Sequence, residues 1–135
     1  MIFLCDYYNQ ASKDLAYSLQ AAGYDATTVV INPDGFLPQG ALSPFTYYVE
    51  AAEETGKPRF FNQVPVPAFW EISGNNQMAR VSNLTEERAR ITYPEGSKAR
   101  IVKSVEWLDK SGKIRQVDHY NKYGFCFAKT THDEN

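Results

Sequence analysis

The sequence of 135 residues has few of the side chains that bind metals or form disulfides. It contains two cysteines, Cys5 and Cys126, and two histidines, His119 and His132. These four residues are too scattered to form a zinc-ligand pattern, so no metal site and no bound cofactor is expected. Without a secretory leader pattern, two reduced, buried thiols are favoured, and a disulfide is the less favoured alternative.

The sequence also lacks an excess of charge and a long apolar run. Fourteen basic and sixteen acidic residues give a net charge of −2, which argues against a nucleic-acid binder with its basic stripe. The apolar opening stops at Asp6 and has no basic region, unlike a signal peptide or a spanning helix. We therefore expect a cytoplasmic protein with no nucleic-acid partner and no transmembrane segment, and leave open a peripheral position at the inner membrane face.

Motifs of phosphate binding and nucleophilic catalysis are missing as well. Residues 5–14, "CDYYNQASKD", contain no GxGxxG loop, so this segment is not expected to bind a nucleotide. No serine lies in a GxSxG elbow. Glu50, Glu53 and Glu54 are more typical of a solvated turn than of a paired-acid site. No residue is assigned a catalytic role.

The N-terminal third predicts a strand, a helix and a strand, the pattern of a βαβ unit. Residues 2–5, "IFLC", and 26–32, "ATTVVIN", have strand composition. Ser12 is the predicted helix cap, and Gly23 provides a left-handed stop. Apolar residues on one stripe of this helix are Leu15, Leu19 and Ala22.

After a loop with three prolines and two glycines at residues 32–45, the sequence predicts antiparallel β-structure. We divide the chain into residues 1–40, the βαβ start, and 41–135, an extended antiparallel meander of about seven strands. The fold class is α+β, mostly β. Strand-like segments after the loop are residues 45–51, 59–63, 68–73, 78–82, 88–93, 99–109, 114–123 and 125–130.

The turn "KSGK" at residues 110–113 joins two strands that are unusually long for a small domain. Charges on both of their faces suggest a sheet with one largely wet face. If Leu108 lies opposite Ile114, a regular ladder fixes the other cross-strand pairs. These predicted pairs are Val105 with Val117, Trp107 with Arg115, and Lys103 with His119.

Residues 116–127, "QVDHYNKYGFCF", place an acid, an imidazole, two phenols and a thiol within twelve residues. Successive side chains of a strand point to opposite faces, so Asp118 and His119 cannot form a dyad. Nothing places Cys126 within reach of His119 as a nucleophilic pair would require. The segment is therefore interpreted as a strand, with Tyr120 and Tyr123 available for binding on opposite faces.

A second segment, "FFNQVPVPAFWEI", sets two amides beside a rigid extended stretch and an aromatic side chain. Asn62, Gln63 and Trp70 would suit a sugar or a peptide. They suit equally an indole buried in the core, which we favour.

Several segments together resemble the N-terminal region of GtfB, the glycosyltransferase-stabilising subunit of the accessory Sec system. They are "LAYSLQAAGY", "VVINPDGFLPQGALSPFTYY", "RFFNQVPVPAFWEISG" and "RIVKSVEWLDKSGKIRQVDHYNKYGFCFAKT". The resemblance implies that the βαβ start opens a Rossmann-like lobe and that the meander is an add-on β-sheet domain. It also implies that the chain is a fragment of a longer protein.

In function, the resemblance implies a non-catalytic chaperone subunit. It would stabilise a GtfA-like glycosyltransferase and bind the serine-rich repeat adhesin that receives O-linked N-acetylglucosamine. Exposed edge strands could also pair with a second copy. A carbohydrate-binding β-module, or part of a nucleotide-sugar-dependent glycosyltransferase, remains as an alternative. Candidates for the interaction surface are Trp70, Trp107, His119, Tyr120, Asn121 and Tyr123.

Overall fold

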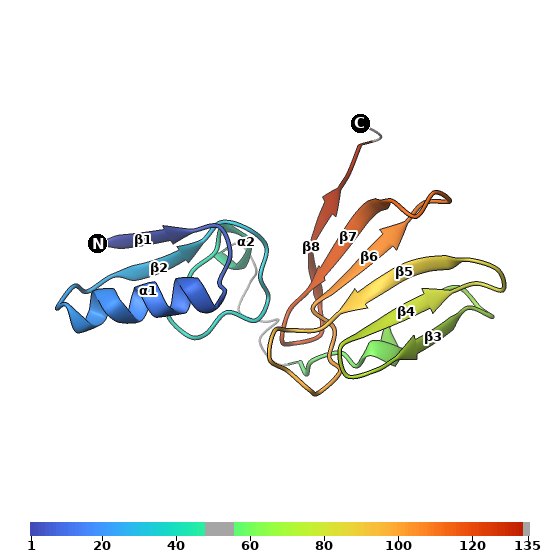
Figure 1. Cartoon of the computed structure of the whole chain (residues 1–135), viewed down its shortest axis with the longest axis horizontal. Helices are drawn as coiled ribbons and strands as arrows, with labels where there is room; N and C mark the ends of the chain where they lie inside the picture. The colour runs from blue at the N-terminus through green and yellow to red at the C-terminus, as the bar shows by residue number, and fades with distance from the viewer. Residues whose placement is uncertain (48–55, 134–135) are drawn as a thin grey trace.

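A computed structural model describes residues 1–47 and 56–133 and shows two β-sheets (Figure 1). Strands β1 and β2 form a parallel pair, and β3 to β8 form an antiparallel sheet in chain order. The predicted α+β, mostly β class is confirmed, although the second sheet has six strands instead of about seven. In chain order the elements are β1 (Ile2–Cys5), α1 (Gln10–Ala21), β2 (Thr27–Val30), α2 (Pro44–Tyr47), the 3₁₀ helix η2 (Phe61–Gln63), β3 (Glu71–Gly74), β4 (Met78–Ser82), β5 (Glu87–Thr92), β6 (Ser104–Leu108), β7 (Ile114–Tyr120) and β8 (Cys126–Thr131).

The predicted βαβ unit is present, but a different residue caps its helix. The side chain of Asn9 accepts a hydrogen bond from the backbone N–H of Ser12 at 3.0 Å. Ser12 lies inside the first turn, and its own hydroxyl donates to the carbonyl oxygen of Tyr7 at 2.5 Å. Asn9 is therefore the N-cap, and the assignment of Ser12 was wrong. Gly23 ends the helix at φ +90°, as predicted.

The half-buried side of α1 is also rotated from the predicted stripe. Leu15 is 52% exposed and Ala22 is exposed, so only Leu19 of that stripe is partly buried. Leu19 shares the packed side with Ser12 and Ala16, which lie seven and three residues before it along one helix face.

The six-stranded sheet buries one face and leaves the other polar. Directly opposite residues of an antiparallel pair share a face, and the register places Val81, Ala89 and Trp107 in one row and Arg80, Arg90 and Glu106 in the next. The first row belongs to the core, which residues of the 61–70 segment cover. The polar row confirms that one face of the sheet carries charged side chains. The buried residues of the core cluster are Val64, Ala79, Val81, Ala89, Ile91, Tyr93, Val102, Val105 and Tyr120.

Two predicted strands are helical where the structure describes them. Residues 59–63 make a single bridge, Phe60 with Ile101, and then turn as η2 because the Gln63 side chain accepts from the Phe60 N–H at 3.0 Å. Residues 44–47 form the short helix α2, with Pro44 at its first position, where a missing N–H costs nothing. The rest of the predicted strand 45–51, with Glu50, and the later Glu53 and Glu54 lie outside the described residues.

The predicted register of the β6–β7 hairpin holds at its turn and fails beyond it. Leu108 lies opposite Ile114, but a bulge then leaves Arg115 unpaired on β7. The Arg115 guanidinium donates through Nε to Asp109 Oδ2 at 2.8 Å, which ties the extra residue to the turn. Every later pair is consequently displaced by one residue. The observed pairs are Trp107 with Gln116, Val105 with Asp118, and Ser104 with His119.

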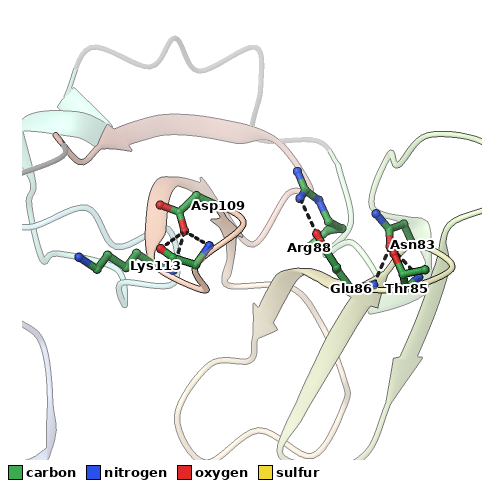
Figure 2. Close-up of polar contacts among 7 residues, drawn as sticks. Asn83, Thr85, Glu86, Arg88, Asp109 and Lys113 are labelled. Atoms are coloured by element: carbon green, nitrogen blue, oxygen red, sulfur yellow. Dashed lines mark hydrogen bonds and ion pairs between the residues drawn. The ribbon is translucent and has the colours of Figure 1, made fainter.

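The Asp109 carboxylate organises the β6–β7 turn (Figure 2). We predict from its hydrogen bonds that the fold loses stability in acid. The carboxylate accepts from the Ser111 hydroxyl and the N–H groups of Ser111 and Lys113, and these bonds hold its pKa well below the usual range. Because the pKa of Asp109 is lower in the folded state than in the unfolded state, where it is about 4, the ionised carboxylate stabilises the fold above that pH. The stabilisation is lost as the pH falls toward the folded pKa. We expect wild-type and Asp109→Asn thermal midpoints to differ at pH 6 and to converge toward pH 2.5.

Gly35 joins the N-terminal unit to the sheet. It forms a parallel bridge with Asn121, and its carbonyl oxygen accepts the N–H of Lys122 at 3.0 Å. A Cβ at residue 35 would overlap the backbone of Asn121, so only glycine permits this approach. The Lys122 ammonium also donates to the carbonyl oxygen of Leu37 at 3.4 Å.

Candidate polypeptide-binding groove

The two tryptophans of the predicted surface lie on the packed side of the sheet and are partly buried. Trp70 packs against the core, with the guanidinium carbon of Arg88 5.7 Å from its ring centroid. Trp107 also packs there and donates its indole N–H to Asp118 at 2.9 Å. Gln116 donates to the other oxygen of Asp118 at 2.6 Å. Neither indole is an open, flat platform of the kind that stacks on a sugar ring.

His119 is separated from Asp118 by the alternation of β7, as predicted. Its Nε2 lies 2.8 Å from the hydroxyl oxygen of Thr130, and its ring is tilted against Phe127 at 6.4 Å between centroids. Partial burial lowers the pKa of His119, with Asp118 opposing and Lys103 reinforcing that shift. The imidazole therefore favours its neutral form and serves as a packed, hydrogen-bonded side chain of β7.

The remaining three predicted residues meet at the turn between β7 and β8. Tyr120 and Asn121 are 6% and 7% exposed. Desolvation raises the pKa of the Tyr120 phenol, which keeps it neutral. The Asn121 side-chain oxygen accepts the N–H groups of Tyr123 at 3.0 Å and Phe125 at 3.1 Å. Tyr120 and Asn121 thus support the turn from beneath, whereas Tyr123 is half-exposed on it.

This turn forms one side of a groove of about 820 Å³, within the size range of ligand pockets. The other side comes from residues 57–60, from Gln63 in η2, and from Ile101, which bridges to Phe60. Aromatic and aliphatic side chains alternate with cations along its walls. The residues that line the groove are Lys57, Pro58, Arg59, Phe60, Gln63, Ile101, Tyr123, Gly124 and Phe125.

Two glycines allow the walls of the groove to approach each other. Gly124 has φ +85°, and a Cβ on it would overlap the carbonyl oxygen of Lys57. A Cβ on Gly56 would in turn overlap the carbonyl oxygen of Tyr123. Residues 56–59 therefore run directly against the β7–β8 turn, backbone against backbone, and any larger residue at either glycine would push the walls apart.

Arg59 fixes the floor of the groove. Its Nε donates to the carbonyl oxygen of Gly124 at 3.2 Å, and its Nη1 donates to that of Gln63 at 3.0 Å. The guanidinium carbon also lies 5.7 Å from the centroid of the Tyr120 ring. All of these partners are neutral, and no ion pair within residues 1–47 and 56–133 involves Arg59. Its side chain is thus held in one position while no described residue neutralises its charge.

The sequence nominated Tyr123 but missed most of the groove. Arg59 and Phe60 fell in a predicted strand, and Phe125 fell in the predicted strand 125–130. Gln63 also fell in a predicted strand, although it was noted with Asn62 and Trp70 as suiting a sugar or a peptide. A cation flanked by apolar residues within "KPRFF" is the one local signal, and it is weak because such patterns are common on ordinary surfaces. The groove depends on a contact between residues 65 positions apart, Arg59 and Gly124, which no local pattern encodes.

The described residues offer binding groups and no catalytic constellation. Across residues 1–47 and 56–133, no group of three or more His, Cys, Asp and Glu side chains could hold a metal ion. Both cysteines are free, but Cys126 is exposed and Cys5 is partly exposed, so their predicted burial was wrong. Cys126 lies on the edge strand β8, which pairs on one side only among the described strands. Although Cys126 is exposed, partial desolvation of its thiol and the nearby Asp118 raise the pKa of Cys126, which opposes nucleophilic use.

No helix in the described part of the chain is long and apolar enough to cross a membrane.

Comparisons with known proteins point to a single family. A family model described as the GtfB N-terminal domain matches residues 2–48, and one described as the GtfB middle domain matches residues 70–135. The chain is 55% identical over 132 residues to the UDP-N-acetylglucosamine–peptide N-acetylglucosaminyltransferase stabilizing protein GtfB of Streptococcus gordonii. It is 57% identical over the same length to the protein of that name from Streptococcus pneumoniae serotype 4. Each alignment covers 98% of this chain and 29% of the relative.

A solved structure agrees with these sequence matches. The crystal structure of a GtfA/B complex bound to UDP and GlcNAc contains a chain that is 54% identical to this one, with a TM-score of 0.81. The match covers 99% of this chain and 30% of that chain. The chain therefore spans less than a third of the length of the relatives it matches.

Proposed function

Because this chain belongs to the GtfB family, we propose that it is part of a non-catalytic subunit that stabilises a partner glycosyltransferase. We propose further that it binds the Ser/Thr-rich polypeptide that receives N-acetylglucosamine. The stabilising role is supported by the name of the relatives and by the GtfA/B complex to which the chain is similar. Because the chain spans less than a third of these proteins, it would contribute one part of each role.

The groove at the β7–β8 turn is the observation that carries the binding role. Its walls present half-exposed aromatic rings, with Phe60 49% and Phe125 42% exposed, between polar groups. Aromatic rings give large contact area, and an open groove accepts an extended chain. Among the described lining residues there is no acid, imidazole or thiol to activate a nucleophile. The geometry therefore favours holding a polypeptide over modifying it.

The division into a βαβ start at residues 1–40 and a β-sheet domain at 41–135 stays a prediction under this proposal. So does the pairing of an edge strand with a second copy. The proposal also implies a cytoplasmic protein, since the relatives act with a glycosyltransferase whose donor is a UDP-sugar.

We predict that Phe125→Ala weakens acceptor binding while the partner enzyme remains stabilised. Truncating one half-exposed aromatic contact should raise the Kd roughly threefold to tenfold. The measurement is fluorescence anisotropy of a labelled Ser/Thr-rich peptide titrated with the complex of full-length protein and partner glycosyltransferase. The yield of soluble partner on co-expression provides the readout of stabilisation.

Phe69→Ala is the matched control, because Phe69 is another phenylalanine, 90% exposed, that does not line the groove. Its Kd should stay at the wild-type value. Equal weakening by both substitutions, or a partner that is equally soluble without the full-length protein, would contradict the proposal.

A further inference from the structure

The groove carries positive charge that the described residues do not neutralise. Lys57 and Arg59 both line it, and none of its nine lining residues is acidic. The four ion pairs found within residues 1–47 and 56–133 involve neither of them. An occupant with negative charge would therefore meet two unpaired cations, whereas a neutral occupant would leave them facing apolar walls.

The two cations differ in how they can act. Arg59 is fixed by two carbonyl oxygens and an aromatic ring, so its charge is pre-positioned and requires no ordering when an occupant binds. Lys57 is exposed and lines the groove. Its flexible ammonium acts as a point charge that can follow an anion over several ångströms.

Arg59 offers an occupant its charge and its remaining N–H groups. Its Nε and Nη1 atoms each donate to a carbonyl oxygen, that of Gly124 and that of Gln63, so a carboxylate beside Arg59 would meet a fixed positive charge and the N–H groups that these two bonds leave over. The aromatic walls, Phe60 and Phe125, suit small apolar side chains spaced between the charges.

We propose that the groove selects acidic polypeptide segments, in which Glu or Asp alternates with small residues such as serine and alanine. The inference rests on the proposed acceptor role and gives that acceptor a charge. Carboxylates of the bound segment would lie near Lys57 and above Arg59, and the intervening residues would contact Phe60 and Phe125.

The test compares two peptides that differ only in charge. A labelled Ser/Ala/Glu repeat and its Ser/Ala/Gln counterpart of equal length are titrated with the full-length protein in complex with its partner enzyme. We expect the Glu peptide to bind roughly tenfold more tightly in 50 mM salt and to lose most of that advantage at 500 mM, because salt screens exposed charges. Lys57→Ala should weaken the Glu peptide roughly threefold to fivefold and leave the Gln peptide unchanged.

Lys110→Ala is the matched control, since Lys110 is an exposed lysine in the β6–β7 turn that does not line the groove. It should leave both affinities unchanged. If the two peptides bind equally, the charge preference is wrong while acceptor binding stands. If neither peptide binds, the proposed acceptor role itself fails. If UDP displaces the Glu peptide from wild-type protein but not from Lys57→Ala, the groove is a phosphate site and the inference is overturned.

Discussion

Replacing Gly124 with alanine is expected to lower the free energy of opening of the β7–β8 turn by about 3 kcal/mol, near the top of the usual range for single substitutions. Two costs combine at this position. The backbone has φ +85°, where a residue with a Cβ loses roughly 1–2 kcal/mol. The new methyl group would also overlap the carbonyl oxygen of Lys57, so the two walls of the groove would have to separate.

Gly112→Ala separates these two costs. Gly112 has nearly the same backbone angle, φ +82°, in the β6–β7 turn, but no atom lies within 4 Å of the position a Cβ would take. It should therefore lose only the conformational part, about 1 kcal/mol. The difference between the two variants measures the close contact between residues 57 and 124, which shapes the groove.

Hydrogen exchange of the full-length protein in complex with its partner is the suitable measurement, because it reports local opening in a large protein. A loss of about 3 kcal/mol corresponds to roughly 100-fold faster exchange of the amides in residues 120–126. The Gly112 variant should show the smaller increase, confined to residues 109–114. Equal exchange in the two turns would mean that the Gly124 approach to Lys57 contributes nothing to the fold.

The parts of the fold that sequence predicted are those determined by neighbours along the chain. Residues 2–5 and 78–82 were predicted as strands and are strands with those bounds, because alternation and β-branched composition act locally. The helix stop at Gly23 was recoverable for the same reason, since one residue supplies the left-handed angle. The opposite orientation of Asp118 and His119 followed from strand periodicity alone.

The failures have a common cause in single residues that interrupt a regular pattern. The extra residue at Arg115 displaces the β6–β7 register, and its position depends on a bond to Asp109 across the turn. Gln63 converts a predicted strand into η2 by capping Phe60 with its side chain. In both cases a side-chain hydrogen bond competes with the regular pairing of a β-ladder. Composition does not reveal which of the two forms.

The candidate site was predictable only on one side. The β7–β8 turn carried a visible signal in its tyrosines, its asparagine and its glycine, and three of the six nominated residues lie there. Its counterpart, residues 57–63, carried only weak signals, because the groove exists only after a contact between distant segments. The segment 116–127, interpreted from the sequence as a strand, forms most of β7 and the turn that makes one side of the groove.

Asn121→Ala is expected to lower the free energy of opening of the β7–β8 turn as much as Gly124→Ala does. The cause is the loss of hydrogen bonds instead of a steric overlap. The buried Asn121 side chain accepts hydrogen bonds from two backbone N–H groups, those of Tyr123 and Phe125. Alanine removes this one acceptor oxygen and leaves two backbone donors without their partner in a partly buried turn. At 1–3 kcal/mol for each unsatisfied buried group, the expected loss is about 3 kcal/mol.

Asn83 provides the matched control, because it holds the β4–β5 turn with the same chemistry through exposed hydrogen bonds (Figure 2). Its side-chain oxygen accepts the N–H groups of Thr85 at 2.9 Å and Glu86 at 2.7 Å. Water can replace that oxygen, so Asn83→Ala should cost only about 1 kcal/mol.

Asn121→Asp retains the acceptor oxygen, so its amides in residues 120–126 should exchange more slowly than those of Asn121→Ala. Because Asn121 bridges Gly35 through its backbone, which alanine retains, amides of residues 34–37 should retain their protection in the Asn121→Ala variant. Loss of protection there, or equal costs at the two asparagines, would show that the turn is held by the junction with the N-terminal unit and not by the Asn121 amide.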